Sequence, residues 1–197
     1  MILRGAAAAF VAALALGTSS AHAADGDMAL GRADAPVTVV EYASVTCSHC
    51  AHWQAEVWPA FKAKWIDTGK VRYVLRELPT NPRPLAVDGF LVARCAGPDR
   101  YFDVVDRLMA DQKTIFQEGD REAWLTKASG LTPQAVQACV DDPAAQEAFE
   151  DRVRVNLGEH AVAGTPSFFV DGKQVGDGFA TLQDLEAAVQ PRLKKGR

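Results

Sequence analysis

The chain of 197 residues is 48% hydrophobic and carries a formal net charge of −4 at pH 7, which is enough sequence for one domain with a full hydrophobic core. This mildly acidic balance, without long basic runs, argues against nucleic acid as a partner. Beyond the N-terminal segment, no stretch is long and apolar enough to predict a membrane-spanning helix.

The N-terminal segment has the features of a secretory signal peptide. Arg4 supplies a positive charge, residues 5–16 form an apolar, Ala-rich run, and Ala21-His22-Ala23 places small residues around a cleavage site. The apolar run is shorter than the ~20 residues that cross a bilayer, so a membrane anchor is the less favoured alternative. We predict that the signal peptide, residues 1–23, is removed after Ala23. A single mature domain of residues 24–197 would remain, with 20 Lys and Arg against 25 Asp and Glu, or −5.

The first part of the mature chain predicts a β-α-β unit of a parallel sheet. Residues 24–36 are short and polar and indicate a leading arm, whereas residues 37–42 are β-branched and apolar, as in a buried strand. Residues 71–78 alternate and predict the next strand. Pro59 should kink the helix that begins near Ser48. The apolar stripe of that helix consists of Trp53, Val57, Phe61 and Trp65.

A long helical region follows, in which breaks at Gly and Pro separate five periodic segments. Together they predict an all-helical subdomain inserted at about residues 82–160. The five segments are residues 85–96, 101–116, 121–129, 133–140 and 144–160.

Strand signals return after Gly164. Asp171-Gly172, between residues 167–170 and 173–175, is typical of a tight hairpin. Thr181 and Asp184 form a capping box that opens a closing helix. The fold class is therefore α/β, with the order β-α-β, helical insertion, β-β-α.

The motif Cys47-Ser48-His49-Cys50 lies at the turn from the first strand to the first helix. Two thiols at this spacing can close a small ring, which suits disulfide exchange better than stapling a fold. The unpaired N–H groups and the dipole at a helix N-terminus stabilise a thiolate, and a protonated His49 would add a positive charge. The motif thus predicts Cys47 as the nucleophile.

Three features in register make the mature chain similar to the DsbA-like members of the thioredoxin superfamily, which are exported thiol-disulfide oxidoreductases. These features are Glu41 ahead of the Cys47–Cys50 motif, the helical insertion, and Gly164-Thr165-Pro166. The resemblance implies a thioredoxin-like fold with an inserted helical subdomain. It also implies a redox-active Cys47–Cys50 disulfide with no further cofactor.

The same resemblance implies an activity, a location and partners. We expect a periplasmic monomer that introduces disulfide bonds into unfolded or partly folded exported polypeptides. Its reoxidising partner would be a membrane-embedded, quinone-linked protein of the DsbB type.

The resemblance gives roles to three further residues. Glu41 matches the buried acid that relays a proton to Cys50, and burial should raise its pKa; the alternative is an acid at a strand edge facing water. Pro166 is expected to follow a cis peptide bond, and the backbone of Thr165 to pair with an extended substrate. An ordinary trans proline at the start of a strand is the alternative.

Two departures from the family pattern concern the direction of the reaction. Ser48 stands where enterobacterial DsbA enzymes have proline, and Thr165 stands where they have valine. Thr-Pro resembles the isomerases DsbC and DsbG, but residues 24–36 leave no room for the dimerisation domain of those proteins. We therefore favour an oxidase, with an isomerase or reductase on the same fold as the alternative.

The remaining cysteines, Cys95 and Cys139, each lie near the end of a predicted helix in the insertion. Two buried free thiols are one reading, but in an exported protein a structural disulfide is favoured.

A metal site is not predicted. His52, His49 and the two cysteines of the motif are crowded in one turn, without the second ligand pair that a structural zinc site uses. A non-catalytic binding or chaperone module, in which the cysteine pair is incidental, is the remaining alternative. His160, just before the Thr-Pro loop, could approach the site.

Overall fold

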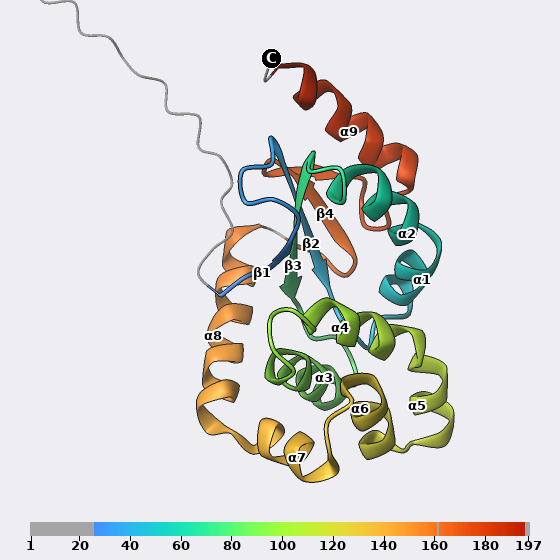
Figure 1. Cartoon of the computed structure of the whole chain (residues 1–197), viewed down its shortest axis with the longest axis vertical. Helices are drawn as coiled ribbons and strands as arrows, with labels where there is room; N and C mark the ends of the chain where they lie inside the picture. The colour runs from blue at the N-terminus through green and yellow to red at the C-terminus, as the bar shows by residue number, and fades with distance from the viewer. Residues whose placement is uncertain (1–25, 161, 196–197) are drawn as a thin grey trace, which may run out of the picture.

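Across the residues that the computed structural model describes, 26–160 and 162–195, a five-stranded mixed sheet carries the fold in the order β1-β3-β2-β4-β5 (Figure 1). The predicted signal peptide lies outside the described residues. β2 and β3 run parallel with Val37 opposite Val71, which confirms the predicted β-α-β unit. The strands are β1 (Met28–Leu30), β2 (Val37–Ala43), β3 (Val71–Glu77), β4 (Ser167–Val170) and β5 (Lys173–Val175).

The leading arm predicted for residues 24–36 contains a short strand, β1, that the sequence did not predict. It pairs antiparallel with β3, Met28 opposite Leu75, and forms one edge of the sheet. A three-residue strand is too short to show an alternating pattern. The unpaired backbone groups at the edge of β3 create its pairing site, and no local sequence signal marks it.

The helix after the cysteine motif is divided into three segments. Its break lies at Val57, because Pro59 follows as the second residue of the next segment and has no N–H to donate. The predicted stripe is nevertheless buried, and Trp53 packs against Phe168 of β4 with ring centroids 4.7 Å apart. The segments are α1 (Ser48–Glu56), α2 (Trp58–Phe61) and the π-helical η1 (Lys62–Ile66).

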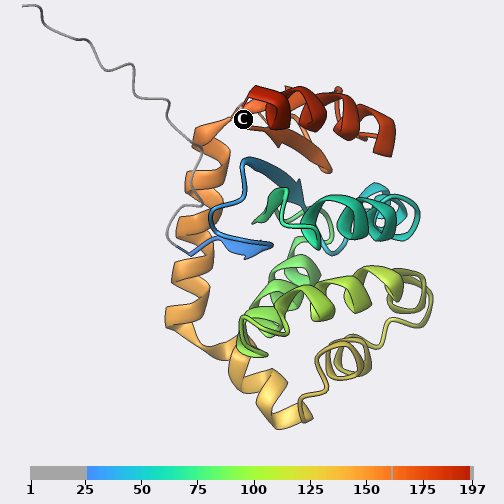
Figure 2. The ribbon, with the colours of Figure 1, turned by 45° about the horizontal axis from the view of Figure 1, so that its top comes forward.

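Six helices lie between β3 and β4 in the described part of the chain, where the helical insertion is predicted. The predicted helix over residues 101–116 is two helices, because the chain turns at Asp111. In Figures 1 and 2 the insertion lies below the sheet, and α8 returns along the side of the molecule to the strands. Its helices are α3 (Arg83–Cys95), α4 (Tyr101–Ala110), α5 (Gln112–Glu118), α6 (Arg121–Ser129), α7 (Pro133–Asp141) and α8 (Pro143–Glu159). Among residues 26–160 and 162–195, no helix combines the length and the hydrophobicity needed to span a bilayer.

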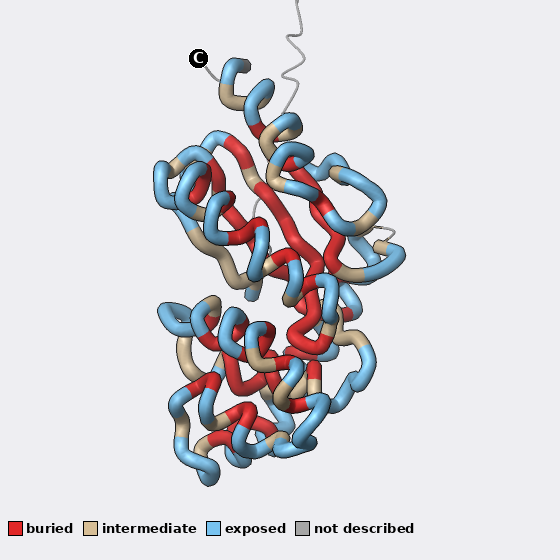
Figure 3. The backbone as a smooth tube through the Cα atoms, turned by 90° about the vertical axis from the view of Figure 1, so that its right-hand side faces the viewer, coloured by how far each residue is buried: buried red, intermediate tan, exposed pale blue. Residues whose placement is uncertain are grey.

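One hydrophobic core joins the sheet to the insertion. Trp53 and Phe168 belong to the same buried cluster as Phe90 and Leu108 of the helical part, and Figure 3 shows buried backbone running from the strands into the helices. The opposite face of the sheet carries a smaller cluster, centred on Tyr42 and consisting of Val40, Tyr42, Val74 and Phe169.

The last hairpin and the last helix form as their turn and capping residues predict. Asp171 and Gly172 have φ angles of 47° and 76°, so the hairpin has the two left-handed turn residues that its sequence predicts. Thr181 and Asp184 exchange the two hydrogen bonds of a capping box, at 3.2 and 3.0 Å. They open α9 (Leu182–Lys195).

A disulfide joins Cys95, the last residue of α3, to Cys139 of α7, across 44 residues of chain. The structure thus has the pairing that the sequence favours. Replacing both residues by alanine should lower the free energy of unfolding by roughly 2–4 kcal/mol, because the unfolded chain regains the entropy of an open loop. Urea unfolding with Cys47 and Cys50 held as the dithiol measures the difference. Unchanged stability would show that this bridge does not hold α3 to α7.

Candidate active site

Cys47 is the N-cap residue of α1. Its backbone is extended, with φ −83° and ψ 119°, and its sulfur accepts a hydrogen bond from the Cys50 N–H at 3.2 Å. A side-chain acceptor at this position satisfies one of the free N–H groups of the first turn. The same N–H group, aligned with the helix dipole, favours negative charge on the sulfur. The site is therefore arranged to hold a thiolate.

The two thiols of the motif have opposite environments. The pKa of Cys47 falls to about 6 because the Cys50 thiol hydrogen-bonds to it, with further contributions from Thr165 and from the backbone N–H groups of Cys50 and His49, which outweigh partial burial. The pKa of Cys50 rises well above its ordinary value because the thiol is fully buried and faces the Cys47 sulfur and Glu41. These environments suit Cys47 to act as a nucleophile and leaving group, and they favour the protonated form of Cys50.

Glu41 lies in the centre of β2, only 1% exposed. Tyr73 of β3 lies two residues before Leu75, which is opposite Glu41, and is therefore on the same face of the sheet as Glu41. It donates a hydrogen bond to the Glu41 carboxyl group. Burial raises the pKa of Glu41 to about 8, although the Tyr73 hydrogen bond acts in the opposite direction. The solvent-facing alternative is therefore wrong. A carboxyl group with this pKa carries a proton at neutral pH and can exchange it, which is the property that a relay requires.

Hydroxyl groups fix the turn ahead of Cys47. The Ser44 and Thr46 hydroxyls lie 3.1 Å apart, and Thr46 also donates to the Thr80 carbonyl at 3.1 Å. The Thr80 N–H donates to the Ser44 hydroxyl at 3.1 Å. The loop after β3 is thereby bound to the end of β2.

The Thr165–Pro166 peptide bond is cis, as the resemblance implies. Its loop reaches the nucleophile, because the Cys47 thiol donates to the Thr165 carbonyl at 3.3 Å. The backbone that is expected to pair with substrate therefore lies directly beside Cys47.

A groove of about 520 Å³ adjoins this loop. The exposed Phe179 stacks on His52 at its wall, with ring centroids 5.6 Å apart. The groove offers apolar surface next to the nucleophile, which suits side chains of an unfolded polypeptide. Its other lining residues include His49, Gly164, Thr165, Pro166 and Gln174.

The structure brings most of the predicted site residues together, but two side chains of the cysteine motif, those of Ser48 and His49, are exposed. The His49 backbone N–H acts on the Cys47 thiolate; a role for the His49 imidazole stays a prediction. Cys95 and Cys139 lie in the helical insertion.

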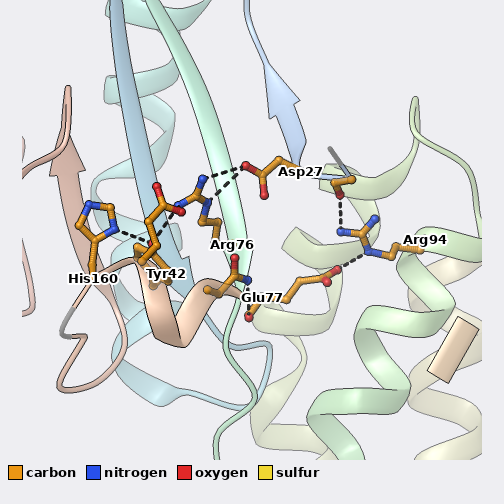
Figure 4. Close-up of polar contacts among 9 residues, drawn as sticks. Asp27, Tyr42, Arg76, Glu77, Arg94 and His160 are labelled. Atoms are coloured by element: carbon orange, nitrogen blue, oxygen red, sulfur yellow. Dashed lines mark hydrogen bonds and ion pairs between the residues drawn. The ribbon is translucent and has the colours of Figure 1, made fainter. Parts of the chain in front are cut away.

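His160 does not reach the cysteine pair. Its Nδ1 lies 2.8 Å from the hydroxyl of Tyr42 (Figure 4). Tyr42 follows Glu41 in β2 and therefore lies on the opposite face of the sheet. There the buried Arg76 donates to Tyr42 at 2.9 Å and pairs with Asp27 at 3.2 Å. These residues form a structural network that joins α8 and β1 to the strands.

Within residues 26–160 and 162–195, no three His, Cys, Asp or Glu side chains come together as potential metal ligands.

Two residues of the site are not predicted from the sequence. Tyr73 is predicted only as part of a strand, and its position on the same face as Glu41 follows once β2 and β3 are paired in register. Gln112, the first residue of α5, contacts the backbone of the cysteine turn. Nothing in its local sequence indicates this contact, since only the tertiary fold brings the two segments together.

Comparison with known proteins agrees with this geometry. A family model described as thioredoxin matches residues 23–190. A Rickettsia bellii protein assigned as a protein-disulfide oxidoreductase is 29% identical over 177 residues, which cover 88% of this chain and 67% of that protein. Four further Rickettsia relatives are 30–32% identical, and the chain spans only 62% of the length of each.

Solved structures share the fold. The crystal structure of Wolbachia pipientis α-DsbA1 superposes with a TM-score of 0.74 at 21% identity, covering 91% of this chain and 99% of that one. BdbD from Bacillus subtilis gives a TM-score of 0.72 at 22% identity, over 86% and 94% of the two chains.

The environment of Cys47 predicts a pH profile. Alkylation of the reduced protein by iodoacetamide should accelerate as the pH rises through about 6, because the thiolate forms there. Cys50 should remain unreactive over the same range. The rates are followed by mass spectrometry between pH 4 and 9, with Cys47→Ala as the control. An inflection near 8.5, the value of an ordinary thiol, would contradict the assignment.

The raised pKa of Glu41 predicts that a neutral residue at this position stabilises the protein at pH 7, because folding then no longer requires the uptake of a proton. At pH 7 the folded protein binds a proton at Glu41 that the unfolded chain has lost, since the pKa is about 8 when folded and about 4.3 when unfolded. This cost grows from about pH 4 up to about pH 8. Glu41→Gln in the dithiol form should therefore be more stable at pH 7, by on the order of 3–4 kcal/mol at most, and the gain should shrink toward pH 4.

Glu77→Gln is the matched control for this measurement. Glu77 is equally buried but pairs with Arg94 at 2.5 Å and Arg152 at 3.0 Å, so its replacement should destabilise the protein. Urea unfolding at several pH values compares both variants with the wild type. A Glu41→Gln variant that loses stability at pH 7 would show that Glu41 is held as an ion.

Proposed function

The chain belongs to the thioredoxin family and has a DsbA-like fold, and from this premise we propose that it is an exported dithiol oxidase that introduces disulfide bonds into polypeptides. The observation that carries the proposal is the opposite shift of the two thiol pKa values, lowered at Cys47 and raised at Cys50. A stable Cys47 thiolate favours the reduced pair, and the disulfide is then a stronger oxidant by about 30 mV for each 1.4 kcal/mol.

The first step is attack by a substrate thiolate on the Cys47 sulfur of the Cys47–Cys50 disulfide. A bond forms between the substrate sulfur and Cys47, the Cys47–Cys50 bond breaks, and its electron pair goes to Cys50. Cys47 is the sulfur attacked because it is partly exposed, whereas Cys50 is fully buried. The product is a mixed disulfide.

Glu41 supplies a proton in this step. Cys50 departs as a buried thiolate, which its environment disfavours. Glu41 is protonated below about pH 8, so it can transfer its proton to Cys50 and recover one when Cys50 is next deprotonated. Tyr73 keeps the carboxyl group oriented through its hydrogen bond.

The second step releases the product. A second substrate thiolate attacks the substrate sulfur of the mixed disulfide, and Cys47 departs with the electron pair. Its low pKa makes it a good leaving group. The substrate has then lost two electrons and the Cys47–Cys50 pair has gained them.

The surroundings of Cys47 suit an extended polypeptide as substrate. The Thr165 carbonyl lies at the nucleophile, and the groove beside Pro166 offers apolar surface that many sequences can occupy. We propose the periplasm as the location and a membrane-embedded, quinone-linked protein as the reoxidising partner. Both rest on the leader sequence and on the family.

The direction of exchange separates an oxidase from an isomerase or reductase. For an oxidase, the equilibrium of the purified protein with glutathione should give a midpoint above about −180 mV, and a reductase would lie near −270 mV. The oxidised protein should also generate disulfides stoichiometrically in a reduced, unfolded test protein. A low midpoint without such oxidation would overturn the proposed direction, and no exchange at all would favour a binding module.

The Cys50→Ala variant, expressed in an exporting host, tests the assignment of the nucleophile. Its Cys47 thiolate should attack a disulfide of an exported polypeptide and displace one of the two sulfurs as a thiolate. The resulting mixed disulfide through Cys47 should accumulate, since the Cys50 thiol that would resolve it internally is absent. Cys47→Ala should trap none.

A further inference from the structure

Gln112 connects the helical insertion to the cysteine turn. It is the first residue of α5 and is 5% exposed. Its Nε2 donates to the Val45 carbonyl at 2.6 Å and to the Cys47 carbonyl at 3.1 Å. One amide group from the insertion therefore binds the backbone of the nucleophile itself, 65 residues away in the sequence.

The two carbonyl groups that Gln112 binds determine where the sulfur lies. The Cys47 carbonyl also accepts the Ala51 N–H at 3.0 Å, the first backbone bond of α1. Val45 precedes the N-cap by two residues. With both carbonyls held, the Cys47 side chain is kept at 3.2 Å from the Cys50 N–H. A displaced N-cap would lengthen this contact and weaken the thiolate.

The amide group also acts through its dipole. Both N–H bonds of Gln112 point toward Val45 and Cys47, so the positive end of the side chain faces the turn that carries the thiolate. Positive partial charge in a buried site stabilises a nearby anion. The orientation of the amide thus gives Gln112 a second means, besides geometry, of acting on the Cys47 thiolate.

The opposite side of the turn is held independently. Thr46, between the two bound carbonyls, donates to Thr80 at 3.1 Å, so the sheet side of the turn remains anchored when Gln112 is replaced. A change at Gln112 should thus alter the position of the sulfur without releasing the whole loop.

We propose that Gln112 is a positioning residue through which the helical insertion fixes the Cys47 turn and sets the redox balance of the Cys47–Cys50 pair. The inference rests on the proposed function for its consequence in exchange. The position of Cys47 and the state of its thiol can be measured without that function.

The test uses the full mature chain with Gln112→Leu and Gln112→Glu. Leucine removes both donors, and glutamate keeps the shape but presents acceptors and, when ionised, a negative charge. The pKa of Cys47, taken from the pH dependence of alkylation, should rise by about 0.5 unit in Gln112→Leu and by more in Gln112→Glu. The equilibrium with glutathione should shift about threefold toward the protein disulfide, since one pKa unit is a factor of ten.

Asn156→Leu and Asn156→Asp are the matched controls. Asn156 is a buried amide of α8 that donates to the Glu77 carbonyl at 3.0 Å, so it also joins the insertion to a strand end but does not touch the cysteine turn. These variants should lose stability while the pKa of Cys47 and the glutathione equilibrium stay unchanged. Gln112→Asn, which keeps an amide but shortens its reach, replaces Gln112→Leu if that variant does not fold.

Two failures can be told apart. If the Gln112 variants keep the wild-type pKa of Cys47 and the wild-type glutathione equilibrium, the inference is overturned. If the wild type itself does not oxidise reduced test proteins but the Gln112 variants still raise the pKa of Cys47, the proposed function fails and the positioning role stands.

Discussion

The position of Cys47 at the N-cap of α1 is the constraint on which the site depends. A serine or threonine at an N-cap accepts an N–H bond and remains neutral, whereas a cysteine there can accept the same bond as an anion. The sulfur therefore completes the helix and stores the charge of the reduced state. Neighbouring elements each make a hydrogen bond to Cys47. Its thiol donates to the Thr165 carbonyl, its carbonyl accepts from the Gln112 amide, and its sulfur accepts from the Cys50 N–H.

Two buried carboxyl groups, those of Glu77 and Glu41, have different roles because their surroundings differ. Glu77, at the end of β3, pairs with Arg94 of α3 (Figure 4) and with Arg152 of α8, and so joins the sheet to both helices. Glu41, on the neighbouring strand, has the neutral Tyr73 hydroxyl as its partner. The ion pairs of Glu77 hold three elements together, whereas burial away from any cation raises the pKa of Glu41 to about 8, so that it can take up a proton near neutral pH. The partners of each acid decide its role.

Much of this fold can be predicted from local sequence signals. The hairpin at Asp171-Gly172, the capping box at Thr181 and the break near Pro59 each follow from the chemistry of one or two residues. β1 and the division at Asp111 could not be predicted, because an edge strand depends on its neighbour and a turn within a helical pattern depends on packing. At the site, Glu41 can be predicted because it is an acid in an apolar strand. Tyr73 and Gln112 cannot be predicted as site residues, since their contacts exist only after β2 pairs with β3 and the insertion folds against α1.

The insertion therefore does more than enlarge the protein. Its core is continuous with that of the sheet, so the position of α5 relative to β2 and α1 is fixed by packing that extends from Phe90 to Phe168. Through Gln112 this packing reaches the backbone of the nucleophile. A hydrogen bond between two elements of one continuous core costs little additional ordering, because both partners are already immobilised. A large helical insertion can in this way tune a thiol without contributing a side chain to the exchange itself.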